Sequence, residues 1–471
     1  MTGRANRATQ GETGAKTDQM TDQSDTFIFT GVEIDEAARE ARLGWRLGAH
    51  QFVERIVFHK PLPALGAPLR APFEAALQLL HLAAGVSYYK TSLPPRLRIE
   101  TAALDHDARA FLQRLYVNGL GEFGVRNGID VAARIDFMGA ACAPDAAKPD
   151  AATLPSRTPL ARRSAVLIGG GKDSLVSVEA LRRAGEPMLL FAVNPKKPIL
   201  DCAQASGLPF ARVDRHLDPL LFELNKQGAL NGHVPITAIV SFIALAAAFV
   251  EGFDAIVLSN ERSADQGNLV ADGREVNHQY SKTTAAERDI AQIIAARVHA
   301  DIAYFSLLRP LSEAHIASLM ARQTRYDAAF TSCNRAFQLN PEKPPARWCG
   351  DCPKCRFSFL MLAKPMGRAR IEAAFGKNML EDESQIKGYE ELMGLSGHKP
   401  WECVGELAES GAALALLAED PAWAQTAVVR ALNPRIRALM PDPAAVQRAL
   451  MTPSPDHRLP PRYEKMLHDY L

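Results

Sequence analysis

The sequence of 471 residues predicts an α/β protein in which a parallel β-sheet is covered by helices on both faces. From Ser164 onward, short apolar runs typical of buried strands alternate with helical patterns, and such alternation favours parallel strands. A glycine-rich segment separates the first of these strands from the helix that follows it. The residues before this region predict an α+β domain, and those after it predict mostly helices.

Changes in composition divide the chain into five parts. Residues 1–25 are polar, lack an apolar signal-peptide segment and predict a disordered tail. Residues 26–140 form the expected N-terminal α+β domain, which is a candidate for substrate binding. Residues 141–163 are rich in Ala, Pro and Asp, a composition typical of linkers. Residues 164–355 hold the alternating strands and helices, and residues 356–471 form the helical C-terminal region.

Bulk composition limits the choice of partners and compartment. The formal net charge of +1 offers no electrostatic argument for binding nucleic acid or a membrane. Seven cysteines, four of them clustered, indicate thiols and a metal in a reducing compartment, and we expect a cytoplasmic protein. The uncharged run Val234–Val250 is short for a membrane span, and its alanines suit a helix buried in an α/β domain.

The N-terminal region mixes several kinds of element. A helix is predicted over Pro72–Ala84, with proline near its start and glycine just beyond its end. Gly85–Thr91 and Phe111–Gly128 are interpreted as exposed loops, with a substrate surface as the alternative. Strands are predicted at Thr26–Gly31, Phe52–Phe58, Arg96–Glu100 and Ile129–Phe137.

In the alternating region, further strands are predicted at Met188–Asn194, Ala211–Asp214, Asp254–Ser259 and Ile302–Ser306. A helix from about Ala285 to Val298 precedes the last of them. Ligands of parallel sheets bind beyond the carboxyl ends of the strands. We therefore expect the site just after Ile168, Asn194, Asp214 and Ser259.

The glycine-rich segment has the properties of a phosphate cradle. Glycines without a Cβ let backbone N–H groups close around an anion, and the following helix adds its own unpaired N–H groups. Neither the Walker pattern nor the dinucleotide pattern fits, because Val166 and Ser174 stand where those patterns need glycine. The alternative is a glycine-rich turn without a ligand. The expected nucleotide-binding residues here are Gly169, Gly170, Gly171, Lys172, Asp173 and Ser174, with Asn194 and Asn260 at later strand ends.

The loop after Ser259 carries the densest group of polar side chains. Glu261 or Asp265 could join Asp173 around Mg²⁺, whose preferred ligands are oxygens. Arg262 and Lys282 could bind phosphate or carboxylate, and His278 could transfer protons. The candidate catalytic residues are Asp173, Glu261, Arg262, His278, Tyr280 and Lys282.

Four cysteines predict a metal site. Cys333 is followed by Cys349, Cys352 and Cys355, and the C-x2-C-x2-C spacing suits a closed tetrahedral zinc site with a structural role. The alternatives are an iron–sulfur cluster or a redox thiol pair. The remaining cysteines, Cys142, Cys202 and Cys403, are interpreted as small core residues.

The C-terminal region contains one segment of mixed character, Gly397–Glu406. It is either a turn between helices or a segment that folds back over the nucleotide site and contacts substrate.

These motifs resemble a known family. Gly169–Ser174 resembles the S-G-G-x-D-S loop of the ATP pyrophosphatases (the PP-loop superfamily, with the adenine nucleotide alpha hydrolase-like fold), with glycine in place of the leading serine. With the four cysteines, the chain resembles 7-cyano-7-deazaguanine synthases. Together with Leu258–Ala264, Val276–Lys282 and His398–Cys403, it looks more like the MurL family of UDP-N-acetyl-α-D-muramoyl-L-alanyl-L-glutamate epimerases.

The resemblance implies an enzyme, an isomerase that inverts the terminal L-Glu of UDP-MurNAc-L-Ala-L-Glu while ATP becomes AMP and pyrophosphate, for peptidoglycan synthesis. Adenylation would remove the charge of the carboxylate and make its α-proton acidic enough to leave. His278, Tyr280 and Lys282 are then candidates for proton transfer or oxyanion stabilisation. The alternatives are another adenylating enzyme, such as an amide- or nitrile-forming ligase or a tRNA-modifying enzyme, and a non-enzymatic nucleotide-binding protein.

Overall fold

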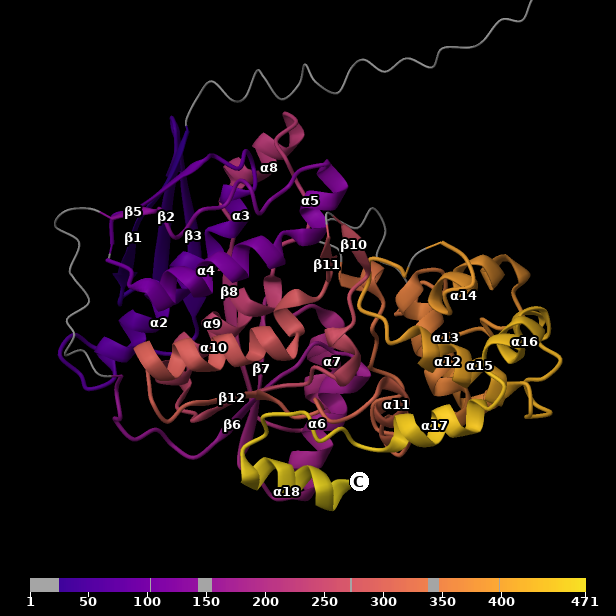
Figure 1. Cartoon of the computed structure of the whole chain (residues 1–471). Coiled ribbons are helices and arrows are strands. Elements are labelled where there is room, and N and C mark those ends of the chain that lie inside the picture. Colours follow the sequence, from indigo (N-terminus) through magenta and orange to yellow (C-terminus); the bar gives the residue numbers. More distant parts are fainter. Residues whose placement is uncertain (1–24, 102, 143–154, 272, 338–346, 398) are drawn as a thin grey trace, which may run out of the picture.

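The computed structural model describes residues 25–101, 103–142, 155–271, 273–337, 347–397 and 399–471. The expected disordered tail lies outside the described residues except for Asp25, as do part of the expected linker and His398. A ten-stranded mixed sheet forms the centre of the molecule (Figure 1). Its strands in spatial order are β12 (Ala303–Ser306), β9 (Ala255–Leu258), β6 (Ser164–Leu167), β7 (Met188–Val193), β8 (Phe210–His216), β3 (His50–Phe58), β2 (Glu40–Leu47), β1 (Thr26–Asp35), β4 (Arg96–Ile99) and β5 (Ala141–Cys142).

The first five strands of that order are parallel, as the alternating sequence predicts. Successive side chains of a strand point to opposite faces, so each strand contributes to two cores. Ala165 and Leu189 belong to one apolar cluster, whereas Val166 and Leu190 belong to the other. The parallel strands are therefore buried on both faces.

Helices cover each of these faces. The first cluster includes residues of α2 (Arg70–Ala84), α9 (Ile236–Glu251) and α10 (Thr284–Arg297). The second includes residues of α6 (Lys172–Arg183), α11 (Glu313–Ala321) and the C-terminal helix α18 (Pro461–Tyr470). The shorter helices α7 (Lys197–Ser206) and α8 (Pro219–Lys226) follow β7 and β8.

The N-terminal strands extend the same sheet. Strands β1, β2 and β3 form an antiparallel meander, β1 also pairs in parallel with β4, and β3 pairs with β8 in antiparallel orientation. At this junction the buried Arg215 donates to both oxygens of the buried Glu54, at 2.7 and 2.9 Å. The expected boundary at residues 141–163 thus does not separate two sheets, and the sheet as a whole is mixed rather than parallel.

Three local predictions in the N-terminal region are wrong. Ile129–Phe137 forms turns rather than a strand. Gly85–Thr91 is not an exposed loop but contains the short buried helix α3 (Val86–Tyr89). Phe111–Gly128 is not a loop either, because α4 (His106–Gly119) and α5 (Gly121–Asn127) cover it. Asp105 caps α4 by accepting from the N–H of Ala108, and glycines within the stretch concealed the helical spacing of its buried side chains.

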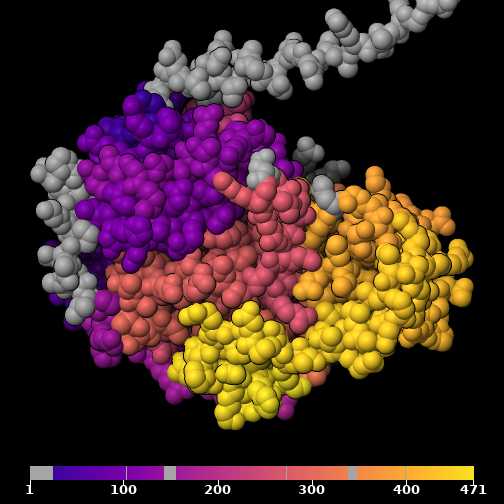
Figure 2. Space-filling view, viewed as in Figure 1, coloured from indigo at the N-terminus to yellow at the C-terminus, as the bar shows by residue number. Residues whose placement is uncertain are grey.

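The C-terminal region is helical, as predicted. Figure 2 shows this part of the chain gathered on one side of the molecule, with the last helix, α18, lying apart from the others. Helix α18 packs on α6, and the hydroxyl groups of Tyr463 and Ser164 are 2.8 Å apart. Within the described ranges, no helix has both the length and the apolar character needed to cross a membrane. Besides α18, the helices of the C-terminal region are α12 (Pro353–Met366), α13 (Arg368–Phe375), α14 (Ile386–Leu392), α15 (Leu407–Leu417), α16 (Ala427–Leu439) and α17 (Pro443–Met451).

Candidate active site

The glycine loop joins β6 to α6 and lines a cavity of about 540 Å³. Gly170 has a φ of +78°, which favours glycine, and Gly171 is the extended residue from which α6 begins. The loop therefore turns sharply and directs the N-terminus of α6 toward the cavity, where unpaired N–H groups favour an anion. Polar residues that line the cavity are Asp173, Ser174, Thr237, Ser259, Asn260, Lys282, Thr331, Ser332, Asn334 and Lys354.

Unlike Asp173 and Ser174, Lys172 is not among the residues that line this cavity. Its ammonium group is buried and forms ion pairs with Asp173 and with Glu313 of α11. Burial lowers the pKa of Lys172, but the carboxylates of Asp173 and Glu313 outweigh that effect and hold the pKa above its usual value. Lys172 thus fastens the start of α6 to α11, and Asp173 is the carboxylate that lines the cavity.

The segment before the first metal-site cysteine contacts the glycine loop directly. The backbone N–H of Thr331 donates to the carbonyl of Gly170 at 2.9 Å. Ser332 lies so close to Gly171 that a Cβ there would approach its hydroxyl to 2.7 Å. One wall of the cavity is therefore built by the residues that lead into Cys333.

The four cysteines form a compact cluster. Their sulfur atoms all lie within 4.8 Å of one another, and those of Cys352 and Cys355 are 3.5 Å apart. Thiolates near 2.3 Å from a tetrahedral zinc ion would be separated by about 3.8 Å. Cys355 lies in the first turn of α12, which Cys352 precedes as the N-cap residue. The cluster therefore fits the tetrahedral ion that the spacing predicts.

The other predicted nucleotide and magnesium ligands have different surroundings. Asn194 uses both ends of its amide on the backbone of Arg215, at 2.7 Å each, rather than lining the cavity. Asn260 is buried, lines the cavity and donates to Ser306 at 3.0 Å. Asp265 accepts from the backbone and hydroxyl of Thr284 at the start of α10.

The loop after β9 also contains Glu261 and Arg262. Glu261 is buried and accepts from the hydroxyl of Ser263, whereas Arg262 lies 3.7 Å from Glu406. Neither Glu261 nor Asp265 is among the residues that line the glycine-loop cavity. Of the expected magnesium ligands, Asp173 is the one on the cavity wall.

His278 lies in a second polar group, outside the glycine-loop cavity. Its Nδ1 contacts the carboxylate of Glu122 on α5, and its ring centroid is 4.3 Å from that of His233. His278 and Cys403 are close enough for each to shift the pKa of the other. Burial lowers the pKa of His278, but Cys403 and Glu122 outweigh it and raise the pKa to about 9. At His233 burial and the nearby His278 outweigh the opposing effects of Glu122 and Cys403 and lower the pKa to about 4.

Lys282 links the two groups. Its side chain lines the glycine-loop cavity, and its Nζ donates to the sulfur of Cys403 at 3.2 Å. Burial opposes the thiolate of Cys403, but the charges of Lys282 and His278 help hold its pKa well below the usual value. We refer to Glu122, His278, Cys403 and Lys282 as the acid–base cluster. Its residues come from α5, the 3-10 segment η2 (Tyr280–Lys282) with the loop before it, and the segment before α15.

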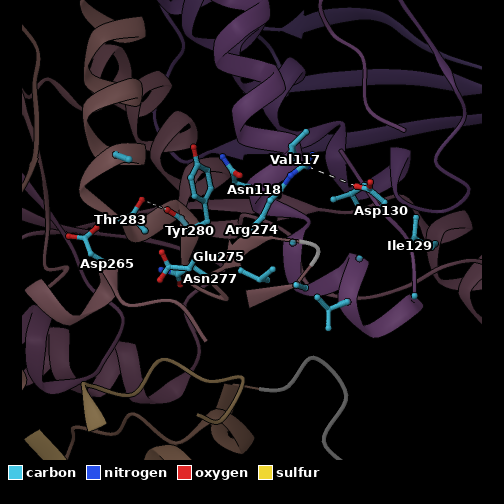
Figure 3. Close-up of a pocket in the computed structure, with 18 residues that line it drawn as sticks. Val117, Asn118, Ile129, Asp130, Asp265, Arg274, Glu275, Asn277, Tyr280 and Thr283 are labelled. Atoms are coloured by element: carbon cyan, nitrogen blue, oxygen red, sulfur yellow. Dashed lines mark hydrogen bonds and ion pairs between the residues drawn. The ribbon is translucent and has the colours of Figure 1, made fainter. Parts of the chain in front are cut away.

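Tyr280 points elsewhere. It lines a separate cavity of about 640 Å³, where it lies beside Asn118 and hydrogen-bonds it (Figure 3). This cavity lies between α4–α5 and the small sheet of β10 (Leu269–Ala271) and β11 (Arg274–Val276). Its charged lining consists of Asp130, Asp265, Glu275 and Arg274, so it is acidic on balance and does not favour a phosphate group.

Several residues of the site escaped the sequence analysis. Glu122 and His233 are far from His278 in sequence, and only the fold brings them together. Thr331 and Ser332 had a usable signal, because they immediately precede a predicted metal ligand. Cys403 had one as well, because it lies in Gly397–Glu406. This segment folds over the loop after β9, where Asn268 donates to the carbonyl of Pro400 at 2.9 Å.

Comparison with known proteins gives consistent matches over most of the chain. Residues 18–307 match the family model of the MurL N-terminal domain, and residues 329–447 match that of the MurL C-terminal domain. A relative from Xanthomonas oryzae pv. oryzae is 43% identical over 93% of this chain and 96% of its own length. Relatives from a Micromonospora species and from Salinispora tropica are 44% and 42% identical, each over 94% of this chain and over 98% and 95% of their own lengths.

All three relatives are named UDP-N-acetyl-alpha-D-muramoyl-L-alanyl-L-glutamate epimerase. The residues that match the two family models include the glycine loop, the four cysteines and the acid–base cluster. The chain belongs to the MurL family.

Proposed function

We propose that this protein is an ATP-dependent epimerase that inverts the terminal L-Glu of UDP-MurNAc-L-Ala-L-Glu to D-Glu, forming AMP and pyrophosphate. The observation that carries the proposal is the position of Lys282, a member of the acid–base cluster that lines the glycine-loop cavity and donates to Cys403. A site that activates a carboxylate with ATP and then moves the adjacent proton needs these two groups of residues side by side. The three relatives with this activity in their names support the same substrate.

The first half of the reaction takes place in the glycine-loop cavity. The N–H groups at the start of α6, with Gly169, Gly170, Gly171 and Ser174, bind the phosphates in the manner of the PP-loop superfamily. Asp173 would hold Mg²⁺, which would neutralise phosphate charge there. The substrate carboxylate attacks the α-phosphorus, pyrophosphate leaves, and the acyl-adenylate forms.

The second half takes place at the acid–base cluster. A free carboxylate resists loss of the adjacent α-proton, because the carbanion would lie beside a negative charge. The acyl-adenylate lacks that charge, and the ammonium of Lys282 stabilises the enolate that forms. Return of a proton to the opposite face and hydrolysis of the mixed anhydride give the D-epimer and AMP.

Zinc at Cys333, Cys349, Cys352 and Cys355 has a structural role in this proposal, because four sulfur ligands leave no open position. The two nucleotide substrates agree with a cytoplasmic enzyme of peptidoglycan synthesis.

The test is to incubate the protein with Mg-ATP and UDP-MurNAc-L-Ala-L-Glu and to measure AMP, pyrophosphate and the chirality of glutamate. The proposal requires D-Glu, with AMP formed only when the dipeptide substrate is present. AMP without D-Glu would instead indicate an adenylating ligase or tRNA-modifying enzyme, and no AMP would indicate a binding protein.

A further inference from the structure

Cys403 lies between two cationic side chains. Lys282 donates to its sulfur at 3.2 Å, and His278, whose Nδ1 contacts the carboxylate of Glu122, is close enough to help lower the pKa of the thiol. A thiol in an apolar core has different neighbours. Cys202 illustrates this, because it belongs to an apolar cluster, its sulfur donates to the carbonyl of Gly170 at 3.7 Å, and burial raises its pKa to about 12.

The segment that carries Cys403 is held in place from several directions. Asn268 donates to the carbonyl of Pro400 at 2.9 Å, and Lys399 donates to Gln266 at 3.0 Å. The guanidinium of Arg126 lies 5.8 Å from the ring centroid of Trp401. Arg126 also donates to Glu122, so the same helix orients His278 and fixes the segment that carries the thiol.

We propose that Cys403 is a catalytic residue, whose thiolate removes the α-proton of the activated glutamate while the His278 imidazolium supplies the proton that enters on the opposite face. This inference rests on the proposed epimerase function. A thiolate oriented by a cation and paired with a histidine that a carboxylate holds is the arrangement of activated cysteines in enzymes.

Each step balances. The Cα–H bond breaks, its proton forms an S–H bond on Cys403, and the electron pair moves into the acyl carbonyl as an enolate. The N–H of the His278 imidazolium then transfers its proton to the other face of Cα, and the carbonyl re-forms. Cys403 is left as a thiol and His278 as a neutral imidazole.

The contact between the two side chains restores the starting state. To admit Cα the two side chains must move apart, and after the product leaves, their contact re-forms. The proton then passes directly from the thiol to the imidazole. In the starting state Lys282 is charged, because the buried thiolate and Glu261 help hold its pKa above the usual value despite burial.

The decisive measurement separates adenylation from proton transfer. We would incubate wild-type protein, Cys403→Ser and Cys403→Ala with Mg-ATP and UDP-MurNAc-L-Ala-L-Glu in D₂O. AMP formation reports adenylation, and deuterium at Cα reports proton transfer. Cys142→Ser is the matched control, because that thiol also lies near an arginine, Arg109, but outside the site.

The expected result is that both Cys403 variants still form AMP but lose Cα deuteration by about 10²–10⁴-fold, the usual contribution of a general base. Wild-type deuteration in either variant would overturn the proposal, as would equal loss of AMP formation and deuteration. If wild-type protein formed neither AMP nor deuterated product, the epimerase function itself would be wrong.

A second test of the role of Cys403 uses alkylation of the wild-type protein and therefore needs no substitution. Iodoacetamide at neutral pH, followed by peptide mass mapping, should modify Cys403 faster than Cys142 and abolish Cα deuteration in proportion. Full deuteration after Cys403 is alkylated would refute the proposal.

Discussion

The substitution Glu122→Gln should shift the pH dependence of epimerisation. The pKa of His278 is about 9 against an ordinary 6.5, because Cys403 and Glu122 outweigh the effect of burial. That difference of about 2.5 units corresponds to about 3 kcal/mol in favour of the imidazolium. Glu122 is one of two groups responsible, so its loss should lower the pKa of His278 by at least one unit, or about 1.4 kcal/mol.

The sign of the effect follows from the role of His278 as the acid. Its protonated form is complete well below its pKa and disappears as the pH rises through it, so the alkaline limb of the rate profile should move to lower pH. At pH 9 the imidazolium fraction would fall from about one half to about one tenth for a shift of one unit, whereas at pH 6 the rates should be similar.

The assay is Cα deuteration between pH 6 and 10, together with the pKa of His278 from NMR titration. Glu74→Gln is the matched control, since Glu74 also pairs with an arginine four residues away, on α2, but lies outside the site. An alkaline limb in Glu122→Gln that coincides with wild type would refute the assignment of His278 as an acid held by Glu122.

Three further predictions concern the glycine loop, the ion pair of Lys172 with Glu313 and the metal site. Gly170→Ala should weaken binding of an ATP analogue, because a Cβ at a φ of +78° costs about 1–2 kcal/mol. Gly169→Ser should be tolerated, because nothing lies within 4 Å of the added Cβ, and equal affinities of the two variants in a calorimetric titration would contradict this. Glu313→Gln should lower the free energy of unfolding by about 3 kcal/mol, because it leaves the buried Lys172 with one carboxylate. The double substitution Lys172→Met with Glu313→Leu should recover much of that loss, and denaturant unfolding measures both effects. Cys349→Ser should lose both bound zinc, measured by atomic absorption, and AMP formation, and an active zinc-free variant would show that the metal does not support the cavity.

The parallel half of the sheet was predictable from the sequence, because each strand there is buried on both faces. Runs such as Met188–Val193 must then be apolar throughout, and that pattern is visible in one dimension. Phe111–Gly128 was misjudged as a loop, because Gly119, Gly121 and Gly124 interrupt the helical spacing. In the folded protein close packing requires two of these glycines, since a Cβ on Gly119 or Gly124 would lie 2.7 Å from Pro235 or from the carbonyl of Ile129.

The site was predictable only where its residues adjoin in sequence. The glycine loop and the cysteine spacing are local patterns, and His278 and Lys282 share one short loop. Cys403 was interpreted as a core residue because it is a cysteine outside the metal-site cluster, and such cysteines usually lie in the core. The cations that lower its thiol pKa include Lys282, which is 121 residues away. Long-range proximity of this kind has no counterpart in spacing or composition.

The junction of β3 and β8 determines which parts of the molecule are able to move. Four residue pairs join these strands, from Arg55–His216 to Phe58–Val213, and the buried Glu54–Arg215 ion pair locks them together. A hinge there would break the ladder and leave a charge buried without its partner, so the N-terminal strands and the parallel strands move together as one rigid sheet. Any movement that admits a substrate as large as a nucleotide-linked muramoyl dipeptide must therefore involve segments outside the sheet. Residues 399–406 are such a segment, because they carry Cys403 and are held to the loop after β9 by hydrogen bonds from Asn268 to Pro400 and from Lys399 to Gln266.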